Sequence, residues 1–600
     1  MHVLAVFVSI DCGATGSYTD ENSIIWTGDD LYNIQNGESQ VVQSPNSVPH
    51  VMSSLKVFSS RKKNCYSVAA DKGGQVLVRA SFFYGNYDKK STPPSFDLHF
   101  DGNFWTTVET SSDRIVSYEA IYVVKGDAVS VCVAQTKPNQ LPFMSALEVR
   151  SLASTMYSHV DANYALFLRR RVAFGSNQTV RYSADPYDRI WAPSVPAAGL
   201  VSVASDLPRI DINVEDNPPQ AVLQNAITTT SASTSIRLGT NLPPIKVPIY
   251  MTFYFAEVAQ LDSTRNRSFT FNIDDQPISK PIIPSYGSVA EKYLTNVTAS
   301  SNTTFSLVAT ADSTLPPLIN ALEVYTVSDA LADGTNPKDL EGLASLQNVF
   351  DVLQGWSGDP CLPSPFTWDW VKCSTAATPR VTALYLSSFG LTGSLPQFSS
   401  MDALQIIDLH NNSLSGEIPD FFGTLPNLKQ LNLANNDFSG TIPASISNNN
   451  NLKLVITGNP NLCISGQSCQ TTGTSTGTSS GITETTAGGR RKKKGNKLPV
   501  ILGPTIPAFV LFWAIVGVVA ILKQKRKTAT VAAAGAFWSG GGLGQNGGGN
   551  RPSGTPNMQM IGKIGQAVMN EQKVEIKEEI SNNEDDQQFD GYPQNPTNAA

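Results

Sequence analysis

Short runs in which apolar and polar residues alternate dominate the first 328 residues of the chain. Clear examples are 75–84 and 268–273, and turns rich in Gly, Pro, Asn and Asp separate such runs. A period of two places one face of each strand in a core, and long helical periodicity is missing here. The pattern therefore predicts a mostly β fold built from jelly-roll β-sandwiches.

The same region contains an internal duplication. Residues 142–149 match 317–324 at an offset of 175, and residues 81–84 match 252–255 at an offset of 171. A weaker similarity relates the segment from Asp20 to Trp26 to the segment from Asp185 to Trp191. The repeats predict two copies of one domain, at 1–155 and 156–330.

Leucine-rich runs follow a helix-like stretch at 340–353. Three leucine-rich runs end at Pro396, Pro419 and Pro443, and these prolines are 23 and 24 residues apart. This spacing predicts a short leucine-rich-repeat solenoid at 381–469, with a small concave face. Asn411 and Asn435 are expected where the repeat turn needs an internally bonded Asn.

One segment is long and apolar enough to cross a bilayer. Residues 498–522 contain no ionisable side chain, and basic clusters stand on both sides. At about 1.5 Å per residue a helix of this length spans the hydrocarbon core. We expect a transmembrane helix here, after a Ser/Thr/Gly-rich basic stalk at 470–497 and before a disordered tail at 523–600.

The orientation of this span rests on glycosylation sequons and cysteines. Six basic residues precede the span and four follow it, which alone favours a cytoplasmic N-terminal side. All seven cysteines precede the span, as expected for an oxidising compartment. The five acceptable N-glycosylation sites also precede it, namely Asn177, Asn266, Asn296, Asn302 and Asn411. We therefore predict a single-pass plasma-membrane protein with an extracellular N-terminal part.

The first residues do not have the form of a signal peptide. They lack a basic n-region, and their short apolar run reads as a first β-strand. Either the span itself directs insertion or the true start lies upstream of Met1, with its signal sequence.

Several motifs resemble the tandem malectin-like region of plant receptor-like proteins. They are Ser9 to Gly13, Asp185 to Trp191, Phe255 to Val258 and the paired Ala-Leu-Glu-Val sequences. The resemblance implies two malectin-like domains, and with them sensing of cell-wall polysaccharide or a secreted peptide. Malectin has two sugar-stacking aromatics after the third motif, whereas this chain has Ala259 and Gln260. The resemblance therefore implies the fold more strongly than the ligand.

A second resemblance covers residues 337–380. Trp356 to Cys361 and Trp368 to Cys373 are similar to the N-terminal cap of plant leucine-rich repeats, including a Gly-Asp-Pro-Cys junction. The resemblance implies a Cys361–Cys373 bridge, and a closing cap that contains Cys463 and Cys469. The other three cysteines are Cys12, Cys65 and Cys132. One of them is left without a partner, and the sequence does not decide which two pair.

Candidate chemistry is limited to binding. Four aromatic residues of the first copy could stack on sugar rings, although core packing is the alternative: Tyr84, Tyr87, Trp105 and Tyr122. The five histidines lack metal-ligand spacing, and the composition gives no reason to expect nucleic-acid binding. The tail lacks the protein-kinase motifs. We expect no metal, no cofactor and no enzyme activity.

These observations together predict a kinase-less receptor-like protein. Its ectodomain would bind cell-wall carbohydrate or a secreted ligand and act through a partner such as a receptor kinase. A structural alternative is a wall-to-membrane tether or a co-receptor scaffold. A third alternative is a carbohydrate-active enzyme, which one catalytic carboxylate substitution would inactivate.

Overall fold

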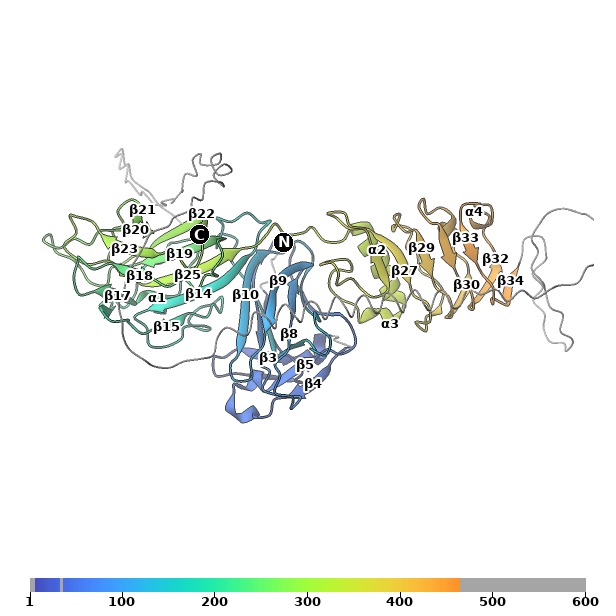
Figure 1. The fold of residues 1–600 in the computed structure, drawn as a ribbon, viewed down its shortest axis with the longest axis horizontal. Coiled ribbons are helices and arrows are strands. Elements are labelled where there is room, and N and C mark those ends of the chain that lie inside the picture. The colour runs from blue at the N-terminus through green and yellow to red at the C-terminus, as the bar shows by residue number, and fades with distance from the viewer. Residues whose placement is uncertain (1–5, 33–35, 464–600) are drawn as a thin grey trace, which may run out of the picture. The chain divides into compact units, whose positions relative to one another are not determined.

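The computed structural model describes residues 6–32 and 36–463 (Figure 1). The predicted stalk, the predicted span at 498–522, the predicted tail and Cys469 lie outside the described residues. Among the helices of these two ranges, none has the length and apolar character needed to cross a membrane. We refer to residues 6–155 as the first β-domain, 156–330 as the second β-domain and 337–463 as the repeat module.

One large sheet runs through both β-domains. Its strands lie in the order β2 (Ser17–Thr19), β3 (Ile25–Gly28), β1 (Phe7–Asp11), β13 (Ala146–Ser151), β7 (Gln75–Phe82), β10 (Val116–Val123), β14 (Leu166–Phe174), β25 (Ala321–Val327), β19 (Val247–Phe255) and β22 (Ala290–Ala299), and β15 (Ala192–Ser194) also pairs with β14. The first domain contributes β1-β13-β7-β10, and the second contributes β14-β25-β19-β22. The two halves join where Ala120 pairs with Phe167 and Ile121 with Leu166.

Each β-domain covers its half of the large sheet with two smaller sheets. In the first domain these are β6 (Lys63–Ala69), β11 (Ala128–Ala134), β8 (Ser95–Phe100) and β9 (Asn103–Glu109), and β12 (Phe143–Met144), β5 (Ser54–Val57) and β4 (Glu38–Val41). In the second they are β18 (Ile236–Leu238), β23 (Phe305–Ala309), β20 (Phe269–Ile273) and β21 (Gln276–Pro277), and β24 (Leu318–Ile319), β17 (Asn225–Thr229) and β16 (Leu200–Ala204). The strand order is the same in both, as the duplicated sequence predicts, and the predicted mostly β fold is confirmed.

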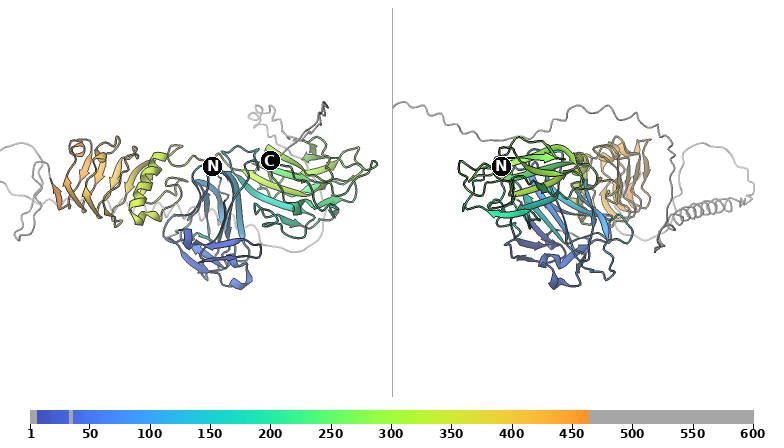
Figure 2. Two further views of the ribbon diagram at one scale, coloured as in Figure 1. Left: turned by 180° about the vertical axis from the view of Figure 1, so that it is seen from behind. Right: turned by 60° about the vertical axis from the view of Figure 1, so that its left-hand side comes forward.

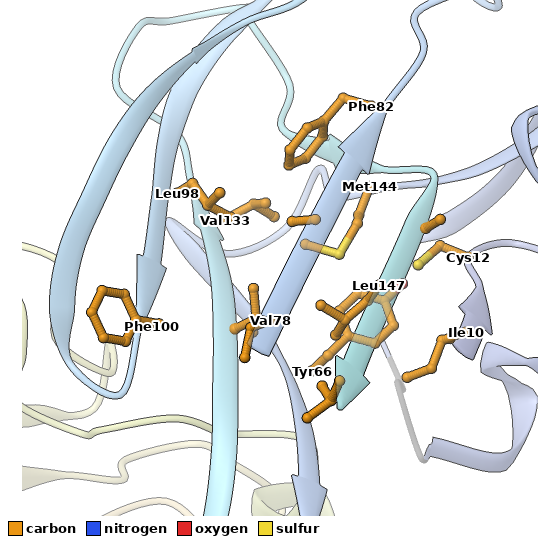
Figure 3. Close-up of a cluster of buried hydrophobic side chains, with 14 of the residues drawn as sticks. Ile10, Cys12, Tyr66, Val78, Phe82, Leu98, Phe100, Val133, Met144 and Leu147 are labelled. Carbon is orange, nitrogen blue, oxygen red and sulfur yellow. The ribbon is translucent and has the colours of Figure 1, made fainter. Parts of the chain in front are cut away.

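The alternating residues of these strands fill the core between the sheets. Figure 3 shows side chains of the first domain, among them Val78, Phe82 and Leu147 from the large sheet and Leu98 and Val133 from the sheet that covers it. All five are fully buried. Burying a side chain of this size contributes about 1.5–3 kcal/mol, so this layer provides much of the stability of the domain.

The weak Asp-to-Trp echo in the sequence corresponds to a repeated hydrogen bond. The indole nitrogen of Trp26 donates to Asp20 at 3.0 Å, and that of Trp191 donates to Asp185 at 2.8 Å. Both tryptophans are buried, so the carboxylate satisfies a donor that would otherwise lack a partner in the core.

The repeat module begins with two helices, α2 (Pro337–Val349) and α3 (Asp351–Gln354), and the Asn336 side chain caps the first. Its strands then stack in two ladders (Figure 2), namely β26 (Val371–Cys373), β27 (Val381–Tyr385), β29 (Ile406–Asp408), β31 (Gln430–Asn432) and β33 (Lys453–Val455), and β28 (Thr392–Gly393), β30 (Ser413–Glu417), β32 (Asp437–Thr441) and β34 (Asn461–Cys463). The remaining short helices are η1 (Asp29–Tyr32), η2 (Pro45–Ser47), η3 (His50–Met52), η4 (Asp420–Gly423), α1 (Gln220–Leu223) and α4 (Ala444–Ser447).

The asparagines that bond inside the repeats are not the predicted ones. Asn411 and Asn435 lie at the surface with positive φ, and the Asn435 amide donates to the Asn411 side chain at 2.8 Å. The next residue along the chain bonds internally, as Asn436 shows by donating to the Leu409 and Leu433 carbonyls. A pair of adjacent asparagines made the one-residue error possible.

Two disulfides lie fully within the described residues. Cys361 bonds to Cys373, as the resemblance implied, and Cys65 bonds to Cys132 on the adjacent strands β6 and β11. Cys12 is a buried free thiol. These pairs settle the choice left open among the three cysteines of the first domain. Cys463 is also disulfide-bonded, and Cys469, the partner expected from the resemblance, lies outside the described residues.

Candidate ligand cleft between the first β-domain and the repeat module

The aromatic residues predicted to stack on sugar lie mostly inside the first β-domain. Tyr84, Trp105 and Tyr122 expose 5% or less of their surface, and Tyr87 is partly buried against the same core. The Trp105 ring stacks on Phe167 with centroids 6.3 Å apart. Their faces therefore pack against protein, and a sugar-stacking role for them stays a prediction that this burial does not favour.

The repeat module docks on the first β-domain through the segment that follows α3. The ammonium group of Lys63 donates to the carbonyls of Asp359 at 2.7 Å and Leu362 at 2.6 Å. The hydroxyl of Ser357 donates to the Cys65 carbonyl at 2.9 Å. A Cβ on Gly358 would lie 2.5 Å from the Cys65 sulfur, so only glycine allows the segment to approach the disulfide this closely.

Asp359 holds this segment in shape. Its carboxylate accepts hydrogen bonds from the backbone and hydroxyl of Thr335, and from the backbone amides of Cys361 and Leu362. Four donors converge on one carboxylate, which fixes the turn before the Cys361–Cys373 bridge. The Gly-Asp-Pro-Cys sequence therefore has a structural explanation, because Gly358 provides the close approach and Asp359 provides the fold of the turn.

A cleft of about 170 Å³ opens beside this docking segment. Its wall from the first β-domain is formed by Tyr32, Asn36, Phe58, Arg61, Lys63, Asn64, Cys65 and Ser67, and its wall from the repeat module by Gln354, Gly355, Trp356 and Ser357. We call this space the junction cleft. Aromatic rings and hydrogen-bonding side chains lie on both walls, which is the combination found in sites for small polar ligands.

The charged groups of the junction cleft are two cations. The Arg61 guanidinium lies 3.8 Å above the Trp356 ring and donates to the Gly355 carbonyl. Burial lowers the pKa of Arg61 to about 10, and Asp369 partly offsets that effect. Burial also lowers the pKa of Lys63 to about 8, with Asp359 partly offsetting it. Both cations are therefore poorly solvated, although they line the cleft.

Sequence reasoning missed this site. Trp356 belongs to a motif that the resemblance identified, but nothing in the local sequence marks Arg61 or Lys63 as site residues. The two walls come from segments almost 300 residues apart. No group of three or more potential metal ligands occurs within residues 6–32 and 36–463, where such groups could be searched for.

The five predicted glycosylation sites all lie within the described residues. Asn177, Asn296, Asn302 and Asn411 are exposed, and Asn266 is half-buried. Four belong to the second β-domain and one to the repeat module, so the first β-domain and its wall of the junction cleft carry no sequon. Attachment of glycans at these sites stays a prediction.

A second cluster of ionisable groups is buried near the β10–β14 junction. Arg171 pairs with Glu119 of the first β-domain at 2.7 Å and with Glu323 of the second at 2.6 Å. Nearby, the backbone amide of Asp216 donates to Glu291 at 3.4 Å, and the Thr252 hydroxyl donates to Asp216. Burial, with Glu323 adding negative charge, raises the pKa of Asp216, and burial with Asp216 raises the pKa of Glu291.

These raised carboxyl pKa values predict a pH-dependent stability. The folded state binds protons more tightly than the unfolded chain, so the stabilisation is complete below the ordinary carboxyl pKa and is lost as pH rises through the raised values. We expect the free energy of unfolding to fall from about pH 5 to about pH 8, and Glu291→Gln to make that fall smaller by about 1–2 kcal/mol. Urea unfolding of the unsubstituted chain and of the Glu291→Gln variant, across this pH range, measures the difference. Parallel curves for the two proteins would contradict the prediction.

Comparisons with known proteins agree with the fold. The malectin-like domain model matches residues 10–327, and the leucine-rich repeat model matches 403–425 and 427–449. A probable LRR receptor-like serine/threonine-protein kinase of Arabidopsis thaliana is 34% identical over 411 residues, covering 66% of this chain and 48% of that protein. An uncharacterized protein of Arabidopsis thaliana is 36% identical over 339 residues, covering 55% of this chain and 67% of that protein.

The chain is also similar to solved structures, among them the extracellular domain of ANXUR1 from Arabidopsis thaliana. That structure aligns with a TM-score of 0.47 and 13% identity, over 54% of this chain and 97% of that chain. The chain spans about half the length of the curated receptor-like kinases it matches. The malectin-like model alone covers over half of the 600 residues, and the matched repeats lie after it, at 403–425 and 427–449. The chain belongs to the malectin-like family, as a member with leucine-rich repeats.

Proposed function

We propose that this chain is a receptor-like protein of the plant cell surface whose extracellular part binds cell-wall carbohydrate or a secreted ligand. The junction cleft is the observation that carries the proposal. It joins aromatic and polar side chains from two modules in one space, and the relatives named as receptor-like kinases support a role in reception.

The topology of the proposed receptor follows from the sequence. Residues 498–522 would cross the plasma membrane once, and the N-terminal part with its five sequons would be a glycoprotein outside the cell. Signalling would pass through a partner, and the relatives named as receptor-like kinases make a receptor kinase one candidate. We propose no catalytic activity for the chain itself.

Binding to an array of plant wall glycans and secreted peptides tests the proposal. We expect saturable binding by the purified full chain, and a loss of about tenfold or more in affinity for Trp356→Ala, because an aromatic anchor of a ligand site contributes 1.4 kcal/mol or more. Trp356→Phe should restore part of the affinity. Tyr385→Ala is the matched control, since Tyr385 is 40% exposed on β27 and lies outside the cleft.

Other outcomes discriminate between the alternatives. Binding that Trp356→Ala leaves unchanged would refute the junction cleft as the site. If the chain binds a ligand only after a second receptor is added, that result would favour the co-receptor scaffold. Release of a shortened glycan would favour the carbohydrate-active enzyme.

A further inference from the structure

The two cations of the junction cleft are held by neutral partners. Lys63 donates to two backbone carbonyls, and Arg61 donates to a third. The amide oxygen of Asn36, oriented to accept, lies 2.8 Å from Nε and 3.0 Å from Nη2 of Arg61. The described residues that line the cleft include two cations and no carboxylate. A ligand entering it therefore meets positive charge that Asp369 and Asp359, outside the lining, offset only in part.

A neutral carbonyl is a weaker partner for a buried cation than an anion is. Hydrogen bonds between a guanidinium and a carboxylate are shorter and about twice as strong as neutral ones, and the planar guanidinium can hold both oxygens. The lowered pKa values of Arg61 and Lys63 agree with this, since burial without a bound acid disfavours the charged form. The neighbouring Lys62 is exposed and does not line the cleft.

The remaining wall residues favour a sugar as the carrier of the acid. Tyr32 and Trp356 are aromatic residues of opposite walls, with Arg61 over one face of the Trp356 ring. Asn64, Ser67 and Gln354 carry hydrogen-bonding groups of the kind that match ring hydroxyls. A volume of about 170 Å³ suits one ring better than a folded peptide segment. The combination of aromatic residues, polar side chains and cations with neutral hydrogen-bond partners fits an acidic sugar residue.

We propose that the junction cleft binds an acidic sugar residue whose carboxylate is held by Arg61 and Lys63, and that this ligand links the repeat module to the first β-domain. The inference rests on the proposed function, and adds the ligand class and a consequence for docking. Because the ligand would contact both walls while Lys63 keeps hold of Asp359 and Leu362, binding stabilises the docked arrangement.

A matched pair of probes tests the charge requirement. Methyl glucuronoside and methyl glucoside differ at one carboxylate, and their binding to the purified full chain can be followed by ligand-observed NMR. We expect the acid to bind at least tenfold more tightly than the neutral sugar, and Arg61→Gln to remove that preference. Arg61→Lys should retain part of it, because the charge stays while the planar fork is lost. Lys62→Gln is the control and should leave the preference unchanged.

The contrary results are separable from failure of the proposed function. Equal binding of both probes, or a preference that survives Arg61→Gln, would overturn the acidic ligand while leaving a cleft that binds sugar. Inorganic sulfate that fails to displace the glucuronoside would support a sugar ligand. Sulfate that binds as tightly as the glucuronoside would show a simple anion site and overturn the sugar. Hydrogen exchange of residues 354–357 should slow only with the glucuronoside. If no ligand of any class bound, both proposals would fail.

Discussion

Replacing Arg171 by methionine is expected to lower the free energy of unfolding by about 3–5 kcal/mol. The Arg171 side chain is fully buried between Glu119 and Glu323, so its removal takes the ion-pair partner from Glu323 and leaves Glu119 with Arg79 alone. An unpaired buried charge costs more than the pair itself contributes. Urea unfolding followed by tryptophan fluorescence measures the change.

Arg169→Met is the matched control for this experiment. Arg169 lies on the same strand but is exposed, and its guanidinium contacts the hydroxyl of Thr326. The control should change stability by less than about 0.5–1 kcal/mol. Since Glu119 belongs to one β-domain and Glu323 to the other, Arg171→Met should destabilise both in one transition. Separate transitions for the two β-domains would show that the shared sheet does not couple them.

Gly358→Ala is expected to destabilise the docking of the repeat module by about 2–5 kcal/mol. Gly358 has φ +73°, and a Cβ there would lie 2.5 Å from the Cys65 sulfur and 3.0 Å from the Cys132 sulfur. Backbone strain in the left-handed region costs about 1–2 kcal/mol, and crowding in a packed site adds about 1–3 kcal/mol. Faster hydrogen exchange of residues 355–362 in the full chain would report the loosened contact.

Gly390→Ala separates strain from crowding. Gly390 has φ +72°, and a Cβ there would meet nothing within 4 Å. Its substitution should therefore cost the backbone strain alone, with exchange near Gly358 unchanged. Equal effects of the two substitutions would mean that Gly358 is required for its backbone conformation and not for contact with the disulfide.

The β-domains and the repeats were predictable because they follow from local periodicity. Alternation with period two marked strands such as 75–84, and the matched Ala-Leu-Glu-Val sequences marked equivalent strands, β13 and β25. The single sheet through both domains was not predictable. It depends on the pairing of Ala120 with Phe167 and Ile121 with Leu166, and two residue pairs leave no pattern in the sequence.

The candidate site was largely beyond sequence reasoning. Aromatic residue type alone does not reveal which face of a strand is covered, so sugar stacking and core packing both stayed open for Trp105 and Tyr122, which are buried in the structure. The junction cleft depends on tertiary contacts between Arg61 and Gly355 and between Lys63 and Asp359. Such contacts join segments distant in the chain, and neither segment alone carries a binding motif.

The central claim is that ligand is taken at the junction cleft, between two modules. Hydrogen exchange of the full chain, with and without its best ligand from the array, tests this claim most directly. Protection should rise together in residues 61–67 and 354–357, which contribute to the two walls. Protection confined to the concave strands β29, β31 and β33, or to the second β-domain, would contradict it.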